Sequence, residues 1–245
     1  MKKQKIVVVT GASYGLGKSL SGRFLLNGYK VYGISRTNPN INDNNFIWVN
    51  VDLLKSESFE LIKNSISESK IDILINNAGV VFAEKSLDFT EETFNKTFGI
   101  NLIAPIKLTS LLKQKLQGGV VVNISSTSDR FAEDGLGMYC SSKVAIDIYF
   151  DSVAIENKDI KVLTILPVYV DTPMLKDIAA KLGFTTDDAV DPLKVAEAIE
   201  KIITDQKLES GSRIMILTNK SMNEIINSER LYYYNIDTKE FKKVK

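Results

Sequence analysis

Tyr139 and Lys143 have the side-chain types and the four-residue spacing that proton exchange with an oxygen atom requires. In a helix, positions i and i+4 lie on one face, so the phenol and the ammonium would be neighbours. A phenol is a poor proton donor or acceptor near neutral pH, because its ordinary pKa is about 10. An ammonium roughly 4 Å away, at an effective dielectric constant of about 20, favours the phenolate by about 4 kcal/mol. The pair would then lower the tyrosine pKa by at most about three units, toward its working range.

A glycine-rich segment near the N-terminus is a second signal, and it matters because the tyrosine–lysine spacing alone also fits an ordinary helix. Residues 5–10 (KIVVVT) form a β-branched run typical of a buried parallel strand, and residues 18–27 have a helical pattern. Between them, Gly11 would allow a tight turn, Gly15 a close approach of the backbone to a ligand, and Gly17 close packing of helix on strand. This arrangement places a pyrophosphate on a helix N-terminus. The alternative is a glycine-rich turn without a ligand, which the position directly after the first strand disfavours.

The elements that must position these residues alternate along the chain. We expect strands near residues 5–10, 30–35, 46–50, 71–75, 119–125, 160–166 and 213–218. Helices are expected near residues 16–27, 56–68, 91–116, 139–156 and 192–205. This alternation predicts the α/β class with a doubly wound parallel sheet of about seven strands and helices on both faces. No linker or repeat divides the 245 residues, which indicates a single domain over residues 1–245.

Residues 220–245 read as a C-terminal extension of this domain. Leu231–Tyr234 and Glu240–Val244 have the pattern of two short strands, and we expect this segment to cover a sheet edge. The alternative is that its three consecutive tyrosines cap a subunit interface or the pocket.

Taken together, the motifs resemble the short-chain dehydrogenase/reductase family, whose fold is the Rossmann fold. Their order from Thr10 to Thr172 is that of the family, and the linked motifs together are far more specific than any one of them. The matching segments are TGASYGLG at Thr10–Gly17, NNAG at Asn76–Gly79, an asparagine at Asn101, a serine at Ser126, YCSSK at Tyr139–Lys143, and PVYVDT at Pro167–Thr172.

The resemblance implies hydride transfer to a ketone or aldehyde, with a proton delivered by Tyr139. Ser126 would hold the substrate oxygen, and the family spacing selects it over the neighbouring Ser125. Lys143 would lower the Tyr139 pKa and bind the nicotinamide ribose. Asn101 would hold a water that connects Lys143 to solvent. The expected catalytic residues are therefore Asn101, Ser126, Tyr139 and Lys143.

The end of the second strand favours NADP(H) over NAD(H). A dinucleotide fold that prefers NAD usually carries an acid there, on the ribose 2′-hydroxyl, whereas this chain has Ser35-Arg36-Thr37. A guanidinium pairs well with a phosphate, although Arg36 also fits a solvated surface residue. Many NADP-preferring relatives carry a basic residue where this chain has Tyr14, so the selectivity would be modest.

Further contacts with the cofactor are also implied by the resemblance. Asp52 and Leu53 would meet the adenine, although an aspartate there also fits a turn or helix start. Val168 replaces a family glycine, so the backbone beside the nicotinamide could follow a different path. The expected cofactor-binding residues are Gly11, Ser13, Tyr14, Gly15, Leu16, Gly17, Ser35, Arg36, Thr37, Asp52, Leu53, Asn77, Ala78, Gly79, Tyr139, Lys143, Pro167, Val170 and Thr172.

Composition excludes several other classes of function. The net charge of +1, with scattered basic residues, gives no electrostatic case for nucleic acid. No apolar run reaches the length of a membrane span and no signal peptide is recognisable, so we expect a cytoplasmic protein. The absence of histidine excludes every histidine-based triad, and with one cysteine no zinc or other metal site is expected.

The expected partner is a small-molecule carbonyl or alcohol substrate. Phe82, Phe131, Met138, Tyr169, Met174 and Leu175 could line an apolar pocket or belong to the core, and residues 171–191 have the pattern of a mobile lid. Family analogy also implies a homodimer or homotetramer, which a monomeric mass in solution would contradict. Two other functions stay open: a non-catalytic NADP-binding sensor or scaffold of the same fold, and an alcohol dehydrogenase that works in the oxidising direction.

Overall fold

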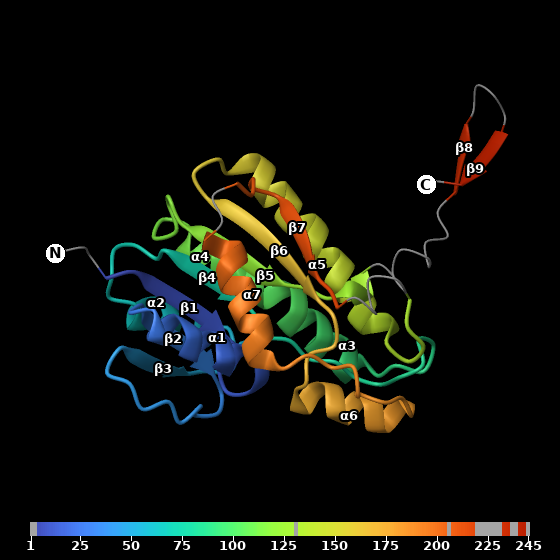
Figure 1. Cartoon of the computed structure of the whole chain (residues 1–245), viewed down its shortest axis with the longest axis horizontal. Helices are drawn as coiled ribbons and strands as arrows, with labels where there is room; N and C mark the ends of the chain where they lie inside the picture. The colour runs from blue at the N-terminus through green and yellow to red at the C-terminus, as the bar shows by residue number, and fades with distance from the viewer. Residues whose placement is uncertain (1–3, 130–131, 205–206, 219–231, 236–239, 244–245) are drawn as a thin grey trace.

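Seven parallel strands form the centre of the molecule (Figure 1). The structure, a computed structural model, describes residues 4–129, 132–204, 207–218, 232–235 and 240–243. Neighbouring strands are parallel throughout, in the spatial order β3-β2-β1-β4-β5-β6-β7. They are β1 (Ile6–Thr10), β2 (Lys30–Ser35), β3 (Phe46–Asn50), β4 (Ile73–Asn76), β5 (Val120–Ile124), β6 (Lys161–Pro167) and β7 (Ser212–Ile216). The predicted doubly wound α/β fold is confirmed. At every strand end, the observed bound agrees with the predicted one or differs from it by one or two residues.

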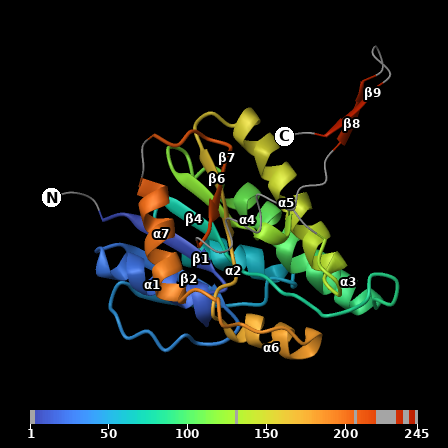
Figure 2. The same cartoon turned by 45° about the vertical axis from the view of Figure 1, so that its right-hand side comes forward.

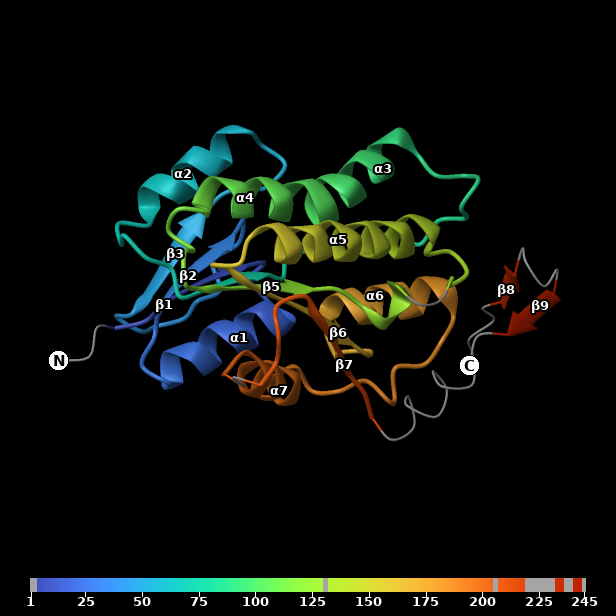
Figure 3. The same cartoon turned by 90° about the horizontal axis from the view of Figure 1, so that it is seen from above.

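Helices cover both faces of the sheet (Figure 3). One face carries α1 (Gly15–Leu26) and α7 (Pro192–Thr204), and the other carries α2 (Glu57–Ser65), α4 (Ala104–Leu112) and α5 (Gly137–Glu156). Successive strand residues point to opposite faces, so each strand feeds both cores. Val8 packs in the core under α4 and α5, whereas Val7 and Val9 pack under α1 and α7. This explains why the strands read as continuous apolar runs.

The helix predicted over residues 91–116 is wrong as a single element. The chain forms α3 (Glu91–Phe98), a π-helical turn η1 (Gly99–Ile103) and then α4. Pro105 has no N–H, so it cannot donate the α-helical bond to the carbonyl of Asn101, four residues earlier. The wider turn, in which Ala104 donates to the Gly99 carbonyl, is the result. It lies at one of the expected functional residues, as π-helical turns often do.

The segment expected to be a lid contains a regular helix, α6 (Pro173–Leu182), which lies at the edge of the main body (Figure 1). Thr172 caps its start by accepting a hydrogen bond from the Leu175 N–H at 3.2 Å. Pro173 occupies the first turn, where a missing N–H costs nothing. Gly183 ends the helix with a left-handed φ of 75°, a conformation that favours glycine.

The C-terminal residues that the structure describes form a separate two-stranded antiparallel sheet. Its strands are β8 (Tyr232–Asn235) and β9 (Glu240–Lys243), as the sequence predicted, while Leu231 and Val244 lie outside the described residues. The pair lies away from the seven-stranded sheet in Figures 1 and 2. In these views the two strands do not cover an edge of that sheet, and the rest of residues 220–245 lies outside the described residues.

In the described parts of the chain, no helix has both the length and the apolar character that crossing a bilayer requires.

Candidate active site

A cavity of about 580 Å³ opens at the carboxyl ends of the central strands. Between β1 and β4 the chain order of the sheet reverses, and doubly wound folds bind ligands at such a point. Most of the site residues expected from the sequence meet here, and only Thr37 and Asn101 do not line the cavity. Those that line it are Gly11, Ser13, Tyr14, Gly15, Leu16, Gly17, Ser35, Arg36, Asp52, Leu53, Asn77, Ala78, Gly79, Ser126, Tyr139, Lys143, Pro167, Val170 and Thr172.

The glycine loop has a backbone that only glycine can form without strain. Gly11 and Gly15 have φ angles of +69° and +51°, which side chains rarely adopt. At Gly17, an added Cβ would lie 2.1 Å from the Gly11 carbonyl oxygen, so a larger residue would displace the loop. The turn at Gly11 and the close packing at Gly17 are thus as the sequence predicted, while the approach of a ligand to Gly15 stays a prediction.

The N-terminus of α1 suits a phosphate group. The N-cap residue, Tyr14, has an extended backbone and no short polar side chain to occupy the first N–H groups of the helix. The first turn carries no acid, so no carboxylate competes with an anion for the positive end of the helix dipole. Together with the glycine backbone, this arrangement fits the pyrophosphate of a dinucleotide.

The NNAG turn after β4 is fastened to the glycine loop. The Asn77 side chain donates to the carbonyl of Thr10 at 2.9 Å, and the Ala78 N–H donates to the Thr10 hydroxyl at 3.0 Å. An added Cβ on Gly11 would lie 2.9 Å from the Ala78 Cα. Small residues are thus required on both sides of this contact, and the turn holds the loop in place.

At the end of β2, Arg36 is exposed and the Ser35 hydroxyl is already hydrogen-bonded within the protein. Arg36 is exposed and lines the cavity. The buried Ser35 hydroxyl donates to the Thr37 carbonyl at 2.8 Å and accepts from the Trp48 indole at 3.2 Å. Thr37 does not reach the cavity. Arg36 is therefore the residue of this tripeptide that remains available to a phosphate.

Asp52 fits both sequence interpretations. Its carboxylate accepts from the Leu54 N–H at 3.0 Å, which is the turn role, and it also lines the cavity.

Val168, which replaces a family glycine, has an ordinary backbone. Its N–H donates to the Ile216 carbonyl at 3.1 Å, and its φ is not positive, because Asn40 is the sole non-glycine residue of the described chain with a positive φ. Val168 thus continues the strand pairing without strain.

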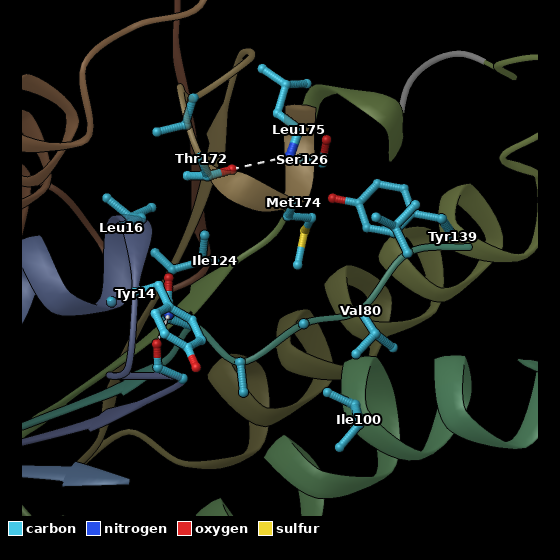
Figure 4. A pocket seen from close by; sticks show the side chains of 18 of the residues that line it. Tyr14, Leu16, Val80, Ile100, Ile124, Ser126, Tyr139, Thr172, Met174 and Leu175 are labelled. Carbon is cyan, nitrogen blue, oxygen red and sulfur yellow. Dashed lines mark hydrogen bonds between the residues drawn. The ribbon is translucent and has the colours of Figure 1, made fainter. Parts of the chain in front are cut away.

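Tyr139, Ser126 and Lys143 meet at the inner end of the cavity. Figure 4 shows the Tyr139 hydroxyl directed toward Ser126. The Ser126 hydroxyl donates to the Ser128 hydroxyl at 3.0 Å and accepts from the Ser128 N–H at 3.1 Å. The Lys143 ammonium donates to the Ile124 carbonyl at 2.9 Å and lies 5.5 Å from the Tyr139 ring centre. A carbonyl oxygen placed beside Tyr139 would therefore also meet a serine hydroxyl.

Burial decides the pKa of Tyr139. It raises this pKa from the ordinary value of 10.0 to about 12, and the hydrogen bond with Ser126 lowers it only in part. The expectation that Lys143 lowers the Tyr139 pKa is wrong here, because Lys143 is itself buried, 5% exposed, and points to the Ile124 carbonyl. Burial lowers the pKa of Lys143 from 10.5 to about 8. The negative charge of Asp147 acts in the other direction and raises this pKa, but by less. Tyr139 is consequently protonated at neutral pH, the form that donates a proton.

Asn101 is buried under the cavity rather than in its lining. Its amide donates to the Val80 carbonyl and to the Ser142 hydroxyl, both at 2.9 Å, and its oxygen accepts from the Val80 N–H at 2.8 Å. An added Cβ on Gly79 would lie 3.6 Å from the Asn101 oxygen and 3.8 Å from the Lys143 ammonium. Asn101 therefore holds the backbone beside Lys143. Its water-binding role stays a prediction. Because both amide hydrogens are used, a water would have to donate a hydrogen bond to the Asn101 amide oxygen or to its backbone carbonyl oxygen.

Replacing Lys143 with Met should change how stability depends on pH. The unfolded chain keeps the Lys143 proton up to about pH 10.5, while the folded protein loses it near pH 8, so wild-type stability rises with pH between these values. The unfolding free energy of the variant, relative to wild type, should fall by about 2–3 kcal/mol from about pH 7 to about pH 10. Urea denaturation at several pH values measures this, and a pH-independent difference would contradict it.

Sequence reasoning missed three polar residues that line the cavity: Lys96 on α3, and the pair Ser128 and Glu133. The Ser128 hydroxyl donates to the Glu133 carboxylate. Ser128 lies in the short 3₁₀ helix η2 (Thr127–Asp129) and Glu133 in the irregular residues before α5, where no periodicity or motif marks a residue as inward-facing. Of the expected pocket residues, Phe82, Tyr169, Met174 and Leu175 line the cavity, Met138 does not, and Phe131 lies outside the described residues.

Comparison with known proteins identifies the family. The model of the short chain dehydrogenase family matches residues 5–183. The chain belongs to this family. It is thus an oxidoreductase, with a nicotinamide cofactor and a small-molecule substrate as is general for short-chain dehydrogenases.

Relatives span different reactions and cofactors. A benzil reductase ((S)-benzoin forming) from Bacillus cereus is 31% identical over 86% of this chain and 99% of its own length. An NAD-dependent glycerol dehydrogenase from Listeria innocua is 33% identical over 58% of this chain and 60% of its own. The solved structure of ElxO with NADP bound has a TM-score of 0.77 at 26% identity, covering 87% of this chain and 97% of that one.

Proposed function

We propose that this protein is an NADP(H)-dependent reductase of ketones or aldehydes, with Tyr139 as the proton donor. The observation that carries the proposal is the meeting of Tyr139, Ser126 and Lys143 in the same cavity as the glycine loop. A nicotinamide dinucleotide bound there supplies a hydride for the carbonyl carbon. The chain supplies everything else: binding of the cofactor, orientation of the carbonyl and delivery of the proton.

In this proposal, the side chains divide the work at the carbonyl oxygen. Ser126 donates a hydrogen bond to that oxygen and stabilises the charge that develops on it, which requires its hydroxyl to turn away from Ser128. The N–H of Ser128 can continue to hold the Ser126 oxygen during this turn. Tyr139 gives its proton to the same oxygen. Lys143 binds the ribose of the nicotinamide in this proposal.

The preference for NADP(H) rests on Arg36 and on the absence of an acid at the end of β2. An exposed guanidinium at the cavity rim can pair with a 2′-phosphate in bidentate geometry. The relationship to ElxO, which was solved with NADP bound, supports this choice, whereas the NAD-dependent relative from Listeria innocua argues for a modest preference.

Replacing Arg36 with Ala tests the cofactor proposal. A lost charge-assisted pair costs about 1.5–3 kcal/mol, so the Kd of NADPH should rise roughly 10- to 100-fold. The Kd of NADH should stay nearly constant, because NADH lacks the phosphate, and it therefore serves as the internal control. Titration of nucleotide fluorescence measures both constants. An unchanged NADPH affinity would exclude the assigned role of Arg36.

The protonation of Tyr139 suits the reductive step, whereas the net direction is set by the ratios of cofactor and substrate forms. With its pKa raised to about 12, the phenol is protonated at neutral pH, as carbonyl reduction requires. The alternative of an alcohol dehydrogenase uses the phenolate as base, in the reverse of the same step. A pure nucleotide sensor would need neither Ser126 nor Tyr139 facing the cavity.

The function itself is tested by turnover. Purified protein with NADPH should consume the nucleotide in the presence of some ketones, aldehydes or diketones. The apolar outer part of the cavity, where the rings of Tyr169 and Phe184 stack with centres 5.5 Å apart, favours aromatic or aliphatic ketones. Tight nucleotide binding without any turnover across a broad panel would favour the sensor.

We also propose that the protein is a homodimer or homotetramer. On the outer side of α5, Val144, Ile148 and Ile155 are 43%, 58% and 70% exposed, whereas Ile146, Phe150 and Ala154 pack in the core. Exposed apolar residues along one helix favour contact with a second copy. The mass in solution decides, and a monomer would refute this proposal.

A further inference from the structure

A chain of hydrogen bonds links the candidate catalytic serine to a carboxylate in the same cavity. The Ser126 hydroxyl donates to Ser128 at 3.0 Å, and the Ser128 hydroxyl donates to one oxygen of Glu133. The second oxygen of Glu133 accepts from the Tyr169 hydroxyl at 3.2 Å. Glu133 thus lies two hydrogen bonds from Ser126, the residue expected to hold the substrate oxygen.

The surroundings of Glu133 are largely apolar. Leu136, Ile178 and Phe184 line the same cavity, and Leu136 and Ile178 are nearly fully buried. An acidic side chain is costly in such a wall unless hydrogen bonds compensate it. Nothing in the hydride-transfer mechanism requires this charge, because Ser126 and Tyr139 already serve the carbonyl oxygen. The carboxylate therefore calls for a second role.

The hydrogen bonds that Glu133 makes leave it able to accept more. A carboxylate has two oxygens and about four lone-pair positions, and Ser128 and Tyr169 use one position on each oxygen. At 3.2 Å, the bond from Tyr169 is at the long end of the usual range for hydroxyl donors, so a better donor can replace it. Within the cavity, Glu133 is consequently an acceptor for a substrate group that donates a hydrogen bond.

We propose that Glu133 selects neutral ketones that carry a hydroxyl group one or two carbons from the carbonyl. The proposal rests on the reductase function proposed above and names its substrate class. With the carbonyl oxygen bonded to Ser126, the hydroxyl of such a ketone reaches the carboxylate, because only one serine hydroxyl separates Ser126 from Glu133. A plain ketone leaves this position unused.

The same carboxylate works against anionic substrates. A keto acid would bring a second negative charge next to Glu133 within a partly dehydrated wall, where like charges repel strongly. The Glu133 charge also contributes to the raised pKa of Tyr139, so it helps to keep the proton donor protonated. Removing this charge should therefore weaken the preference for hydroxyketones and, at the same time, allow keto acids to bind.

The test compares a matched pair of substrates in wild type and in two variants. Wild type should reduce α-hydroxyacetophenone with a kcat/KM about 10- to 100-fold above that of acetophenone, the factor expected for one hydrogen bond to a charged group. Glu133→Met keeps the length but removes the acceptor, so the two substrates should become equal within about threefold. Glu133→Gln removes only the charge, and it should keep part of the preference while admitting benzoylformate, a keto acid.

A neighbouring residue gives the control. Asp134 is 82% exposed and pairs with Lys85 at the surface, so Asp134→Asn changes the same loop and the same charge without touching the cavity. It should leave the substrate ratio unchanged. The Kd of NADPH, which none of these variants should alter, shows that each protein is folded.

The outcomes separate the two proposals. If wild type reduces acetophenone as efficiently as its hydroxy derivative, or if Glu133→Met keeps the preference, the inference about Glu133 is overturned while the reductase function stands. If wild type binds NADPH and reduces neither ketone nor any other carbonyl compound, the proposed function fails and the inference fails with it.

Discussion

Replacing Tyr139 with Phe should lower kcat for ketone reduction by about 10²- to 10⁴-fold, the usual contribution of a positioned general acid. The substitution removes only the hydroxyl that Figure 4 shows directed toward Ser126. The ring, which packs beside Leu136 and Cys140, remains, so the fold should persist. Binding of NADPH should change little. Steady-state reduction at saturating NADPH, with the Kd of NADPH measured in parallel, checks both statements.

The chain offers a matched control on the same helix. Tyr149 is 40% exposed on α5 and does not line the cavity, so Tyr149→Phe removes an identical hydroxyl elsewhere. It should leave kcat unchanged. Full activity of folded Tyr139→Phe would refute the role of Tyr139 as proton donor, and equal losses in both variants would indicate a general effect on the helix.

Replacing Gly17 with Ala should abolish nucleotide binding in practice. The added Cβ would lie 2.1 Å from the Gly11 carbonyl oxygen and 2.5 Å from the Asn77 amide, so the loop that cradles the pyrophosphate must move. Overpacking of this kind costs about 1–3 kcal/mol of stability, and a displaced loop should raise the Kd of NADPH by at least about 100-fold. Nucleotide titration and thermal unfolding measure the two effects.

Gly22, one turn further along α1, is the control. An added Cβ there meets nothing within 4 Å, and alanine in a helix interior is favoured over glycine by about 0.5–1 kcal/mol. Gly22→Ala should thus stabilise the protein slightly and leave the NADPH affinity unchanged. Wild-type affinity in Gly17→Ala would mean that the glycine loop does not bind the cofactor.

The fold was predictable because its determinants are local and repeated. Buried strands that face two helix layers, such as Val7-Val8-Val9, must be apolar on both sides, and this leaves a continuous pattern in the sequence. The glycine loop was predictable for a similar reason, since its positive φ angles at Gly11 and Gly15 restrict the residue type.

Other features depend on contacts that no local pattern records. The burial of Tyr139 raises its pKa, although the tyrosine–lysine spacing predicted a lowered one, and spacing alone cannot show burial. Glu133 belongs to the site through Ser128 and Tyr169, which come from separate segments. The π-helical turn had a readable signal in Pro105, because a proline cannot donate to the carbonyl four residues earlier.

The central claim, that the chain transfers a hydride to a carbonyl, is tested most directly by following the hydrogen itself. Wild-type protein is incubated with NADPH that carries deuterium at the transferable position and with the ketone panel, and the products are analysed by mass spectrometry. The account predicts an alcohol with one deuterium on the carbinol carbon, formed by wild type and nearly absent with Tyr139→Phe. Tight binding of NADPH without deuterium in any product would contradict it and would favour a nucleotide-binding sensor.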